Sequence, residues 1–344
     1  MHVLGGSGRP RGRLGRFLAT DGSVGERVAV DVGRPHAGCV VGKRGSGKSY
    51  TLGVLAEALA DSPGVAPVVV DPMGAFAGLS AAGVRVTEAR VRADALPPRA
   101  WCELLELSPS SPAGTLVWRA ASAESTLDGM RSWVAGRDAD PAAVRAASNH
   151  LALAADWGCF APDAPTVRGL LADGAVLDCT RLAGAALRAV VHGVATAVYR
   201  AAVDGSDVLP WLLVDEAHAC ASGVAASAVE TLYTRGRAPG ASVVLATQRP
   251  SALPDAAVSQ ADLLVAHRLT AGADVDALAA TRPTYLAGGV ADRLPERTGD
   301  ALVVDDATET ACTVRVRERR TKHGGGRPRV TPGSVTGRAT ESDT

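Results

Sequence analysis

The feature that most constrains this chain is a glycine-rich stretch that links an apolar segment to an amphipathic one. It fits the pattern G-x-x-x-x-G-K-[ST] and reads Gly42-Lys43-Arg44-Gly45-Ser46-Gly47-Lys48-Ser49. Residues 39–41 predict a buried strand before it, and the leucine spacing over residues 52–59 predicts a helix after it. A loop of this kind between strand and helix binds phosphates through backbone N–H groups and the helix N-terminus. The sequence therefore predicts a nucleoside triphosphate site in an α/β fold with a mostly parallel sheet.

The side chains of this loop have expected roles. Lys48 is expected to contact the β- and γ-phosphates, and the Ser49 hydroxyl to bind Mg²⁺. The nucleotide-binding residues are predicted to be Gly42, Lys43, Arg44, Gly45, Ser46, Gly47, Lys48, Ser49 and Tyr50. Composition argues against a chance match, because only three of the 36 basic residues are lysine (Lys43, Lys48 and Lys322) and two of them lie in the loop.

Two later strands end in polar residues that suit hydrolysis. The apolar run 211–214 leads into Asp215-Glu216-Ala217-His218, in which Asp215 is expected to hold Mg²⁺ through water and Glu216 to polarise the attacking water. A second buried run, residues 242–246, leads into Thr247-Gln248-Arg249-Pro250. The Gln248 amide is expected to hydrogen-bond both the attacking water and the γ-phosphate.

Composition narrows the class of protein. The chain has 344 residues, is 47% hydrophobic and has no net charge, so charge alone neither indicates nor excludes a nucleic-acid partner. Six cysteines without a C-x-x-C pair indicate free thiols in a reducing compartment. The absence of a long uncharged apolar segment predicts a cytoplasmic protein without a membrane span.

The pattern along the chain predicts five regions. They are an N-terminal arm with short β elements (1–26), the first part of the ATPase core (27–96), a helical insertion (97–169), the second part of the core (170–318) and a disordered tail (319–344). In the insertion, Asp140 and Pro141 are expected to begin a helix as N-cap and first residue. Three tryptophans, Trp118, Trp133 and Trp157, are expected to form a small core rather than a cofactor site.

Two features near the N-terminal half leave alternatives open. Residues 1–14 contain Arg9, Arg11 and Arg13 and fit a flexible arm better than an arm that touches phosphate. Short strands are expected around residues 17–19 and 27–32. Asp71, at the end of the apolar run 65–70, could lie near the nucleotide or could cap the loop that follows it.

The ordered set of motifs resembles the FtsK–HerA superfamily of P-loop motors, and most closely its HerA/VirB4-type ATPases. The resemblance rests on the P-loop and on Asp71-Pro72-Met73-Gly74, Asp215-Glu216-Ala217-His218 and Ala246-Thr247-Gln248-Arg249-Pro250-Ser251. It spans most of residues 27–318. It implies a RecA-like (ASCE) core with helices on both faces of the sheet, ATP and Mg²⁺ as cofactors, a homo-hexameric ring, double-stranded DNA as substrate and a possible nuclease or processing partner.

The resemblance also implies an arginine finger, which acts on the nucleotide of a neighbouring subunit. Arg237, in the turn 236–240, is the matching position, and Arg235 and Arg268 are weaker candidates. Two departures from the family pattern concern assembly. Ala75 stands where family members often carry glutamate, and the N-terminal β-barrel typical of HerA is reduced to some thirty residues.

Other functions remain open at this point. Superfamily 2 helicases share the letters of Asp215 to His218, but they need a second RecA-like domain for which the chain after His218 is too short. A nucleotide-switched regulatory or defence ATPase and a conjugation- or secretion-type motor are the main alternatives. A DNA-pumping ring needs basic residues along its channel, and the insertion offers Arg119, Arg131, Arg137 and Arg145.

Overall fold

The computed structural model describes residues 1–280 and 289–324. Within these residues twelve strands form one sheet. The strands are β1 (His2–Leu4), β2 (Arg11–Leu18), β3 (Val24–Asp31), β4 (Ala37–Val41), β5 (Val65–Asp71), β6 (Arg85–Glu88), β7 (Ala175–Asp178), β8 (Leu209–Val214), β9 (Ser242–Thr247), β10 (Leu263–Ala266), β11 (Asp300–Asp305) and β12 (Thr310–Val316). The α-helices are α1 (Lys48–Ala60), α2 (Pro98–Leu104), α3 (Pro112–Ala123), α4 (Leu127–Ala135), α5 (Pro141–Asp156), α6 (Val167–Leu171), α7 (Gly184–Val203), α8 (Ala217–Cys220), α9 (Ala226–Arg235), α10 (Asp255–Ser259) and α11 (Gly272–Ala280).

The sheet has a parallel part and an antiparallel extension. Its strand order is β1-β3-β2-β12-β11-β10-β4-β9-β8-β5-β7-β6, and the strands from β10 to β6 are all parallel to one another. Strands β4, β8 and β9 are almost continuously apolar because helices cover them on both faces. The fold is therefore the predicted α/β P-loop architecture, with a mostly parallel sheet.

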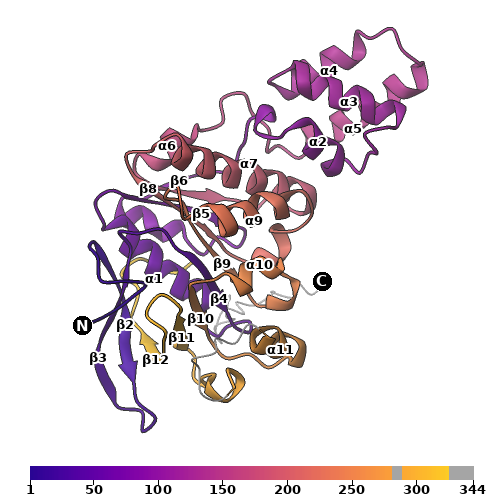
Figure 1. Ribbon diagram of the computed structural model, residues 1–344. Helices are drawn as coiled ribbons and strands as arrows, with labels where there is room; N and C mark the ends of the chain where they lie inside the picture. The colour runs from indigo at the N-terminus through magenta and orange to yellow at the C-terminus, as the bar shows by residue number, and fades with distance from the viewer. Residues whose placement is uncertain (281–288, 325–344) are drawn as a thin grey trace, which may run out of the picture.

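Helices lie on both faces of this sheet (Figure 1). On one face α1 packs through Leu52, Leu55 and Leu59 into a core that includes side chains of β3, β9 and β12. On the other face α7 and α9 form a second core that continues into the helical segment α2–α5. The P-loop helix thus occupies its own face of the sheet.

The N-terminal residues form strands, so the expected flexible arm is wrong. Leu4 on β1 is fully buried, and β1 pairs with β3. Strand β2 pairs with both β3 and β12. Exposed arginines alternate along β2 with buried Gly12 and Leu14, so the arginine-rich composition conceals a half-buried strand.

Helices α2–α5 project from one end of the molecule, opposite the end that carries β2 and β3 (Figure 1). Asp140 caps α5 as predicted, accepting hydrogen bonds from the N–H groups of Ala142 and Ala143. Of the three tryptophans, Trp133 and Trp157 pack against the core, but Trp118 is 38% exposed. The expected tryptophan core is therefore wrong for Trp118, and the fully buried tryptophan of this segment is Trp101. The boundaries of the predicted insertion stay a prediction.

The chain after β12 runs along α1 and does not begin a disordered tail at residue 319. Glu57 of α1 is fully buried and its carboxylate accepts hydrogen bonds from the N–H of Arg320 (2.9 Å) and from the N–H of Thr321 (2.8 Å). Arg319 packs so closely over Gly53 that a Cβ there would lie 2.5 Å from the guanidinium carbon. The segment 317–324 is therefore held to the P-loop helix, and the rest of the predicted tail, residues 325–344, lies outside the described residues.

Among the helices of residues 1–280 and 289–324, none combines the length and apolar character that crossing a membrane requires.

Candidate functional site

The P-loop connects β4 to α1 in a backbone conformation that only glycine tolerates. Gly47 has a φ of 120°, in the region that favours glycine. A Cβ on Gly42 would collide with the hydroxyl of Ser46 and would lie 2.7 Å from Cβ of His267. The glycines at both ends of the loop are therefore required by the turn itself, as the motif predicts.

Neighbouring strand ends hold the loop from two sides. The N–H of Gly42 donates to the carbonyl of Thr247 at the end of β9 (3.3 Å), and the N–H of Lys43 donates to the carbonyl of Arg268 just after β10 (2.7 Å). Because β4, β9 and β10 are parallel, their carboxyl ends meet at this edge of the sheet. The loop is thereby fixed beside the residue that precedes Gln248.

Lys48 is almost completely buried, with its Nζ 3.4 Å from the carbonyl of Lys43. Burial lowers the pKa of Lys48, and the nearby carboxylates of Glu216 and Asp215 oppose this effect. The structure thus brings Lys48 together with Asp215 and Glu216, which lie far from it in the sequence.

Asp215 follows β8 and is fully buried. Its Oδ1 accepts a hydrogen bond from the N–H of Glu216 (3.0 Å), whereas Oδ2 has no hydrogen-bond partner among the described residues. Burial raises the pKa of Asp215 to about 6, and the nearby Ser49 hydroxyl and Lys48 act in the opposite direction. A divalent cation would satisfy the unpaired oxygen, so Asp215 and Ser49 fit the predicted Mg²⁺ ligands.

Glu216 adopts a left-handed backbone conformation with φ 46°, which is strained for a residue with a side chain. Its Oε2 is buried and lies 3.4 Å from Nδ1 of His218, and the same nitrogen is 3.3 Å from the Thr247 hydroxyl. His218 therefore lies between the predicted general base and the end of β9. Gln248, the next residue, is half-buried, and its catalytic role stays a prediction.

The structure decides between the two interpretations of Asp71. Its carboxylate accepts hydrogen bonds from the N–H groups of Met73 (3.2 Å), Ala75 (3.0 Å) and Phe76 (2.9 Å). Asp71 therefore caps the loop after β5. Tyr50 also differs from expectation, because its hydroxyl accepts a hydrogen bond from the N–H of Arg319 (2.7 Å). Its side chain holds the C-terminal segment, which leaves its backbone N–H for a nucleotide.

Arg237 lies at the other edge of the sheet. It precedes the start of β9, and its Nη1 is 3.6 Å from Oδ2 of Asp262, which precedes the start of β10. The length of β9 separates this edge from the P-loop by roughly 16 Å. Arg235 ends α9 near the same edge, whereas Arg268 lies beside the P-loop. An arginine finger at Arg237 stays a prediction.

One buried residue of the site escaped the sequence analysis. His267 is fully buried beneath the P-loop, where Nε2 lies 2.8 Å from the Thr51 hydroxyl and Nδ1 lies 2.8 Å from the carbonyl of Asp300. Burial lowers the pKa of His267 to about 4, and Lys48 adds to this effect. The sequence feature that could have indicated this residue is the polar pair His267 and Arg268, which directly follows a buried strand.

Comparisons with known proteins agree with this geometry. Residues 14–128 match the family model described as "Helicase HerA, central domain" (DUF87), a span that contains the P-loop and ends before Asp215. A search of curated proteins gave no match.

Two solved structures have a similar fold. VirB4 of Thermoanaerobacter pseudethanolicus is similar with a TM-score of 0.70 at 16% identity, covering 92% of this chain and 98% of that one. The bacterial conjugative coupling protein TrwBΔN70 is similar with a TM-score of 0.59 at 16% identity, covering 93% of this chain and 98% of that one. Residues 14–128 are thus similar to the central domain of HerA, and the whole chain shares the fold of VirB4 and TrwBΔN70, with Lys48, Asp215 and Glu216 gathered at one sheet edge.

Proposed function

We propose that the protein is a ring motor that translocates or remodels double-stranded DNA, as a homo-hexamer that hydrolyses ATP between neighbouring subunits. The observation that carries the ATP site of this motor is a set of buried polar atoms that have no hydrogen-bond partner among the described residues: Ser46 Oγ, Asp215 Oδ2 and Glu216 Oε2. Such atoms destabilise a fold unless a ligand satisfies them. A triphosphate with Mg²⁺ and an attacking water offers the partners that these three atoms lack.

Each residue then has a defined task. The P-loop N–H groups and Lys48 hold the phosphates, and Ser49 and Asp215 hold the metal. Bound Mg²⁺ would neutralise charge on the phosphate oxygens. Glu216 accepts the proton of the attacking water, and the Gln248 amide orients that water toward the γ-phosphate. His218, next to Glu216 and Thr247, positions the base relative to the strand that carries Gln248.

The position of Arg237 supports hydrolysis between subunits. Its guanidinium belongs to the sheet edge opposite its own P-loop, too far for an arginine side chain to reach its own nucleotide. An arginine finger at this position acts only on a neighbour, where it stabilises transition-state charge on the γ-phosphate.

Native mass spectrometry with an ATP analogue and duplex DNA tests the assembly, and ATP turnover with and without that DNA tests the coupling. We expect a hexamer that retains DNA and an ATPase rate that DNA increases. A monomer whose turnover ignores DNA would contradict the proposal and favour a nucleotide-switched regulatory or defence ATPase. A ring that forms without responding to DNA would favour a conjugation- or secretion-type motor.

Mixed rings test Arg237 separately. Subunits with Arg237→Ala keep an intact P-loop, and subunits with Lys48→Ala keep an intact finger, so we expect mixing to restore part of the activity that each lacks alone. If mixtures remain inactive while each variant still assembles, Arg237 does not act between subunits. Arg200→Ala, which removes an exposed arginine near the end of α7, is the matched control.

A further inference from the structure

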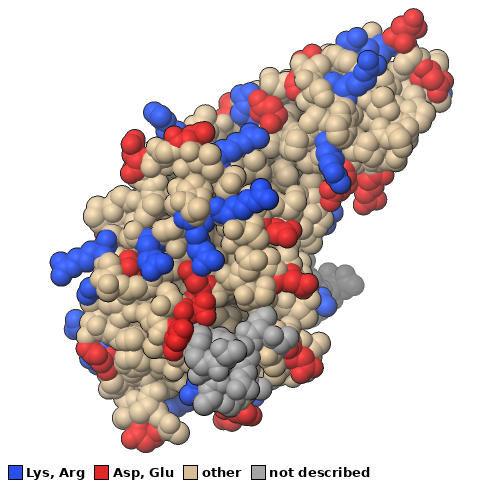
Figure 2. All heavy atoms as spheres, viewed as in Figure 1, with Lys and Arg blue, Asp and Glu red and all other residues tan. Residues whose placement is uncertain are grey.

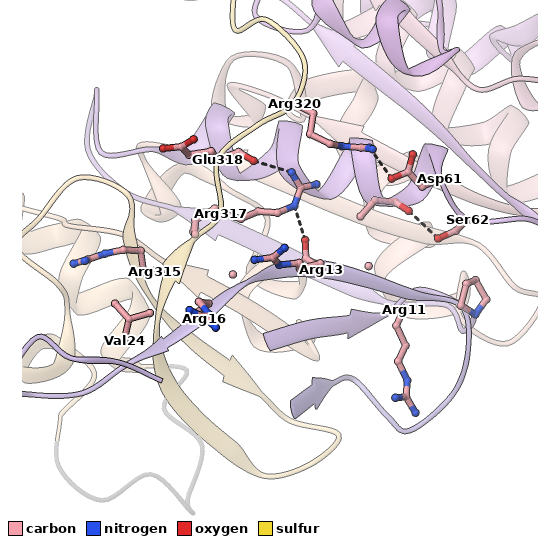
Figure 3. A pocket seen from close by; sticks show the side chains of 15 residues that line it. Arg11, Arg13, Arg16, Val24, Asp61, Ser62, Arg315, Arg317, Glu318 and Arg320 are labelled. Carbon is pink, nitrogen blue, oxygen red and sulfur yellow. Dashed lines mark hydrogen bonds and ion pairs between the residues drawn. The ribbon is translucent and has the colours of Figure 1, made fainter. Parts of the chain in front are cut away.

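A groove of about 660 Å³ lies at the opposite end of α1 from the P-loop, between β2, the chain after β12 and the last turn of the helix (Figure 3). Six arginines line it: Arg11, Arg13, Arg16, Arg315, Arg317 and Arg320. The acidic side chains in its lining are Asp61 and Glu318. This concentration contrasts with the rest of the molecule, because the chain has no net charge and the face in Figure 2 shows basic and acidic side chains interspersed.

A β-bulge leaves three of these arginines exposed along the same strand. Along β2, Arg11 and Arg13 are exposed on either side of buried Gly12, and strict alternation would bury the side chain at position 16. The pairing with β3 shifts by one residue between Arg13 and Gly15. The extra residue resets the alternation, so Arg16 is exposed as well.

The two walls of the groove differ in how their charges are neutralised. On the wall formed by residues 315–320 each arginine has a carboxylate partner: Arg315 with Asp300, Arg317 with Glu57 and Arg320 with Asp61. On the β2 wall, Arg11 donates to the carbonyls of Gly8 and Ser7. The guanidinium groups of Arg13 and Arg16 have no hydrogen-bond or ion-pair partner among the described residues.

The strand register adds to this unbalanced charge. Arg16 is directly opposite Arg315 on one side and Arg27 on the other, so three arginines form a row across β12, β2 and β3. Like charges directly opposite each other destabilise a sheet. Asp300 neutralises Arg315, which leaves the repulsion between Arg16 and Arg27 without compensation inside the described chain. An external anion would remove this repulsion.

We propose that this groove binds the phosphate backbone of duplex DNA through Arg13 and Arg16. The inference rests on the proposed function in taking DNA as the partner. The planar guanidinium groups match phosphate oxygens. The lining contains no aromatic side chain on which an unpaired base could stack, which favours a duplex over a single strand. Contacts of this kind position the DNA without reading its sequence.

The experiment compares wild type with the double variant Arg13→Ala/Arg16→Ala, using fluorescence anisotropy of a labelled duplex oligonucleotide at several salt concentrations. Each lost phosphate contact lowers the slope of log affinity against log salt by about 0.9, so we expect a loss of about 1.8 and binding about 60-fold weaker at 0.1 M salt. The matched control is Arg99→Ala/Arg168→Ala, which removes two exposed arginines from α2 and α6. ATP turnover without DNA should be unchanged in both, and the melting temperature should not fall in either.

The outcomes separate this inference from the proposed function. Equal DNA binding by the two double variants would overturn the groove assignment, and DNA-stimulated turnover in the wild type would still support the motor. Groove-dependent binding without any effect of DNA on turnover would support the groove and contradict the motor. Binding of wild type to phosphatidylserine vesicles but not to the duplex would overturn the assignment in favour of a membrane surface.

Discussion

Buried polar groups near the two ends of helix α1 differ in whether the chain itself supplies their hydrogen-bond partners. At the P-loop end, Ser46 Oγ and Asp215 Oδ2 are buried without hydrogen-bond partners. Farther along, Glu57 is just as buried, but the N–H of Arg320, the N–H and hydroxyl of Thr321 and the guanidinium of Arg317 all donate to it.

The pKa shifts express the same difference. Burial raises the pKa of Asp215 to about 6 because few local groups compensate it. Burial would also raise the pKa of Glu57, but hydrogen bonds from Thr321 and Arg317 outweigh burial and lower it below its ordinary value. A buried carboxylate that its own chain satisfies serves the fold, whereas one left unsatisfied awaits a ligand. The helix therefore divides into a binding end and a structural half.

The largest expected effect is on stability, at the satisfied carboxylate. Glu57→Ala leaves Arg317 and Arg319 buried without their partner, with exposed fractions of 13% and 1%. Breaking a buried ion pair in this way destabilises by about 3–5 kcal/mol. Urea unfolding measures the loss, and Glu230→Ala, at an exposed position of α9, should change stability by less than about 0.5 kcal/mol. Similar values for both variants would show that Glu57 does not hold the C-terminal segment.

At the binding end we expect the reverse, a loss of activity without a loss of stability. Lys48→Ala or Glu216→Gln should lower the ATPase rate by about 100- to 1000-fold, because each removes a group that acts on the transition state. The melting temperature without nucleotide should not fall, since the only hydrogen bond of the Lys48 side chain among the described residues is to the Lys43 carbonyl, at 3.4 Å. Arg168→Ala, which removes an exposed charge on α6 away from the site, is the control. A variant that is both inactive and unstable would mean that Lys48 also supports the fold.

The third prediction concerns the pH dependence of stability. It involves His267, which lies beneath the P-loop and contacts Thr51 of α1. Its folded-state pKa is lowered to about 4, by burial first and by Lys48 as well, while the Asp300 carbonyl and carboxylate act in the opposite direction. An unfolded histidine titrates near 6.5, so the unfolded chain binds more protons between these values and stability falls as the pH falls. This contribution is about 2 kcal/mol between pH 7.5 and pH 5.

Chemical denaturation at both pH values of wild type and His267→Gln isolates the effect. The variant should lose about 2 kcal/mol less than wild type on acidification, and His150→Gln on α5 should behave like wild type. Identical pH dependence in all three proteins would show that His267 is not held in its neutral form.

The smallest effect is expected at Asp61, an exposed residue directly after α1 that pairs with the same C-terminal segment as Glu57. Asp61 pairs with Arg320 at 2.6 Å, and both side chains are more than half exposed. Exposed ion pairs contribute about 0–1 kcal/mol. Asp61→Ala should therefore change the free energy of unfolding by less than about 1 kcal/mol in the same urea experiment. A loss as large as that of Glu57→Ala would remove the distinction between the buried and the exposed pairs.

The sequence predicted the fold class and the polar residues that lie at the P-loop edge, because both follow from local patterns. Apolar runs that end in polar residues gave β4, β8 and β9 together with Lys48, Asp215 and Gln248. The role of Glu57 could not be predicted, because its partners follow it by about 260 residues and a glutamate on a helix is ordinarily exposed. Strand β2 was predicted only at its end, by the short strand expected around residues 17–19. Its first part was missed because arginine and glycine are poor markers of a strand, and its partner β12 lies far away in the chain.

Because β2 pairs with β12, the sheet cannot be completed until residues 310–316 have been synthesised. Arg13 and Arg317 contact each other across 304 residues of chain. At roughly 5–20 residues per second, the ribosome makes the second partner about 15–60 s after the first. During that interval β2 shows an unpaired edge of the kind that promotes aggregation. The P-loop helix likewise waits for residues 317–321 before Glu57 is satisfied, so a nascent chain carries its nucleotide loop well before it has a finished ATPase core.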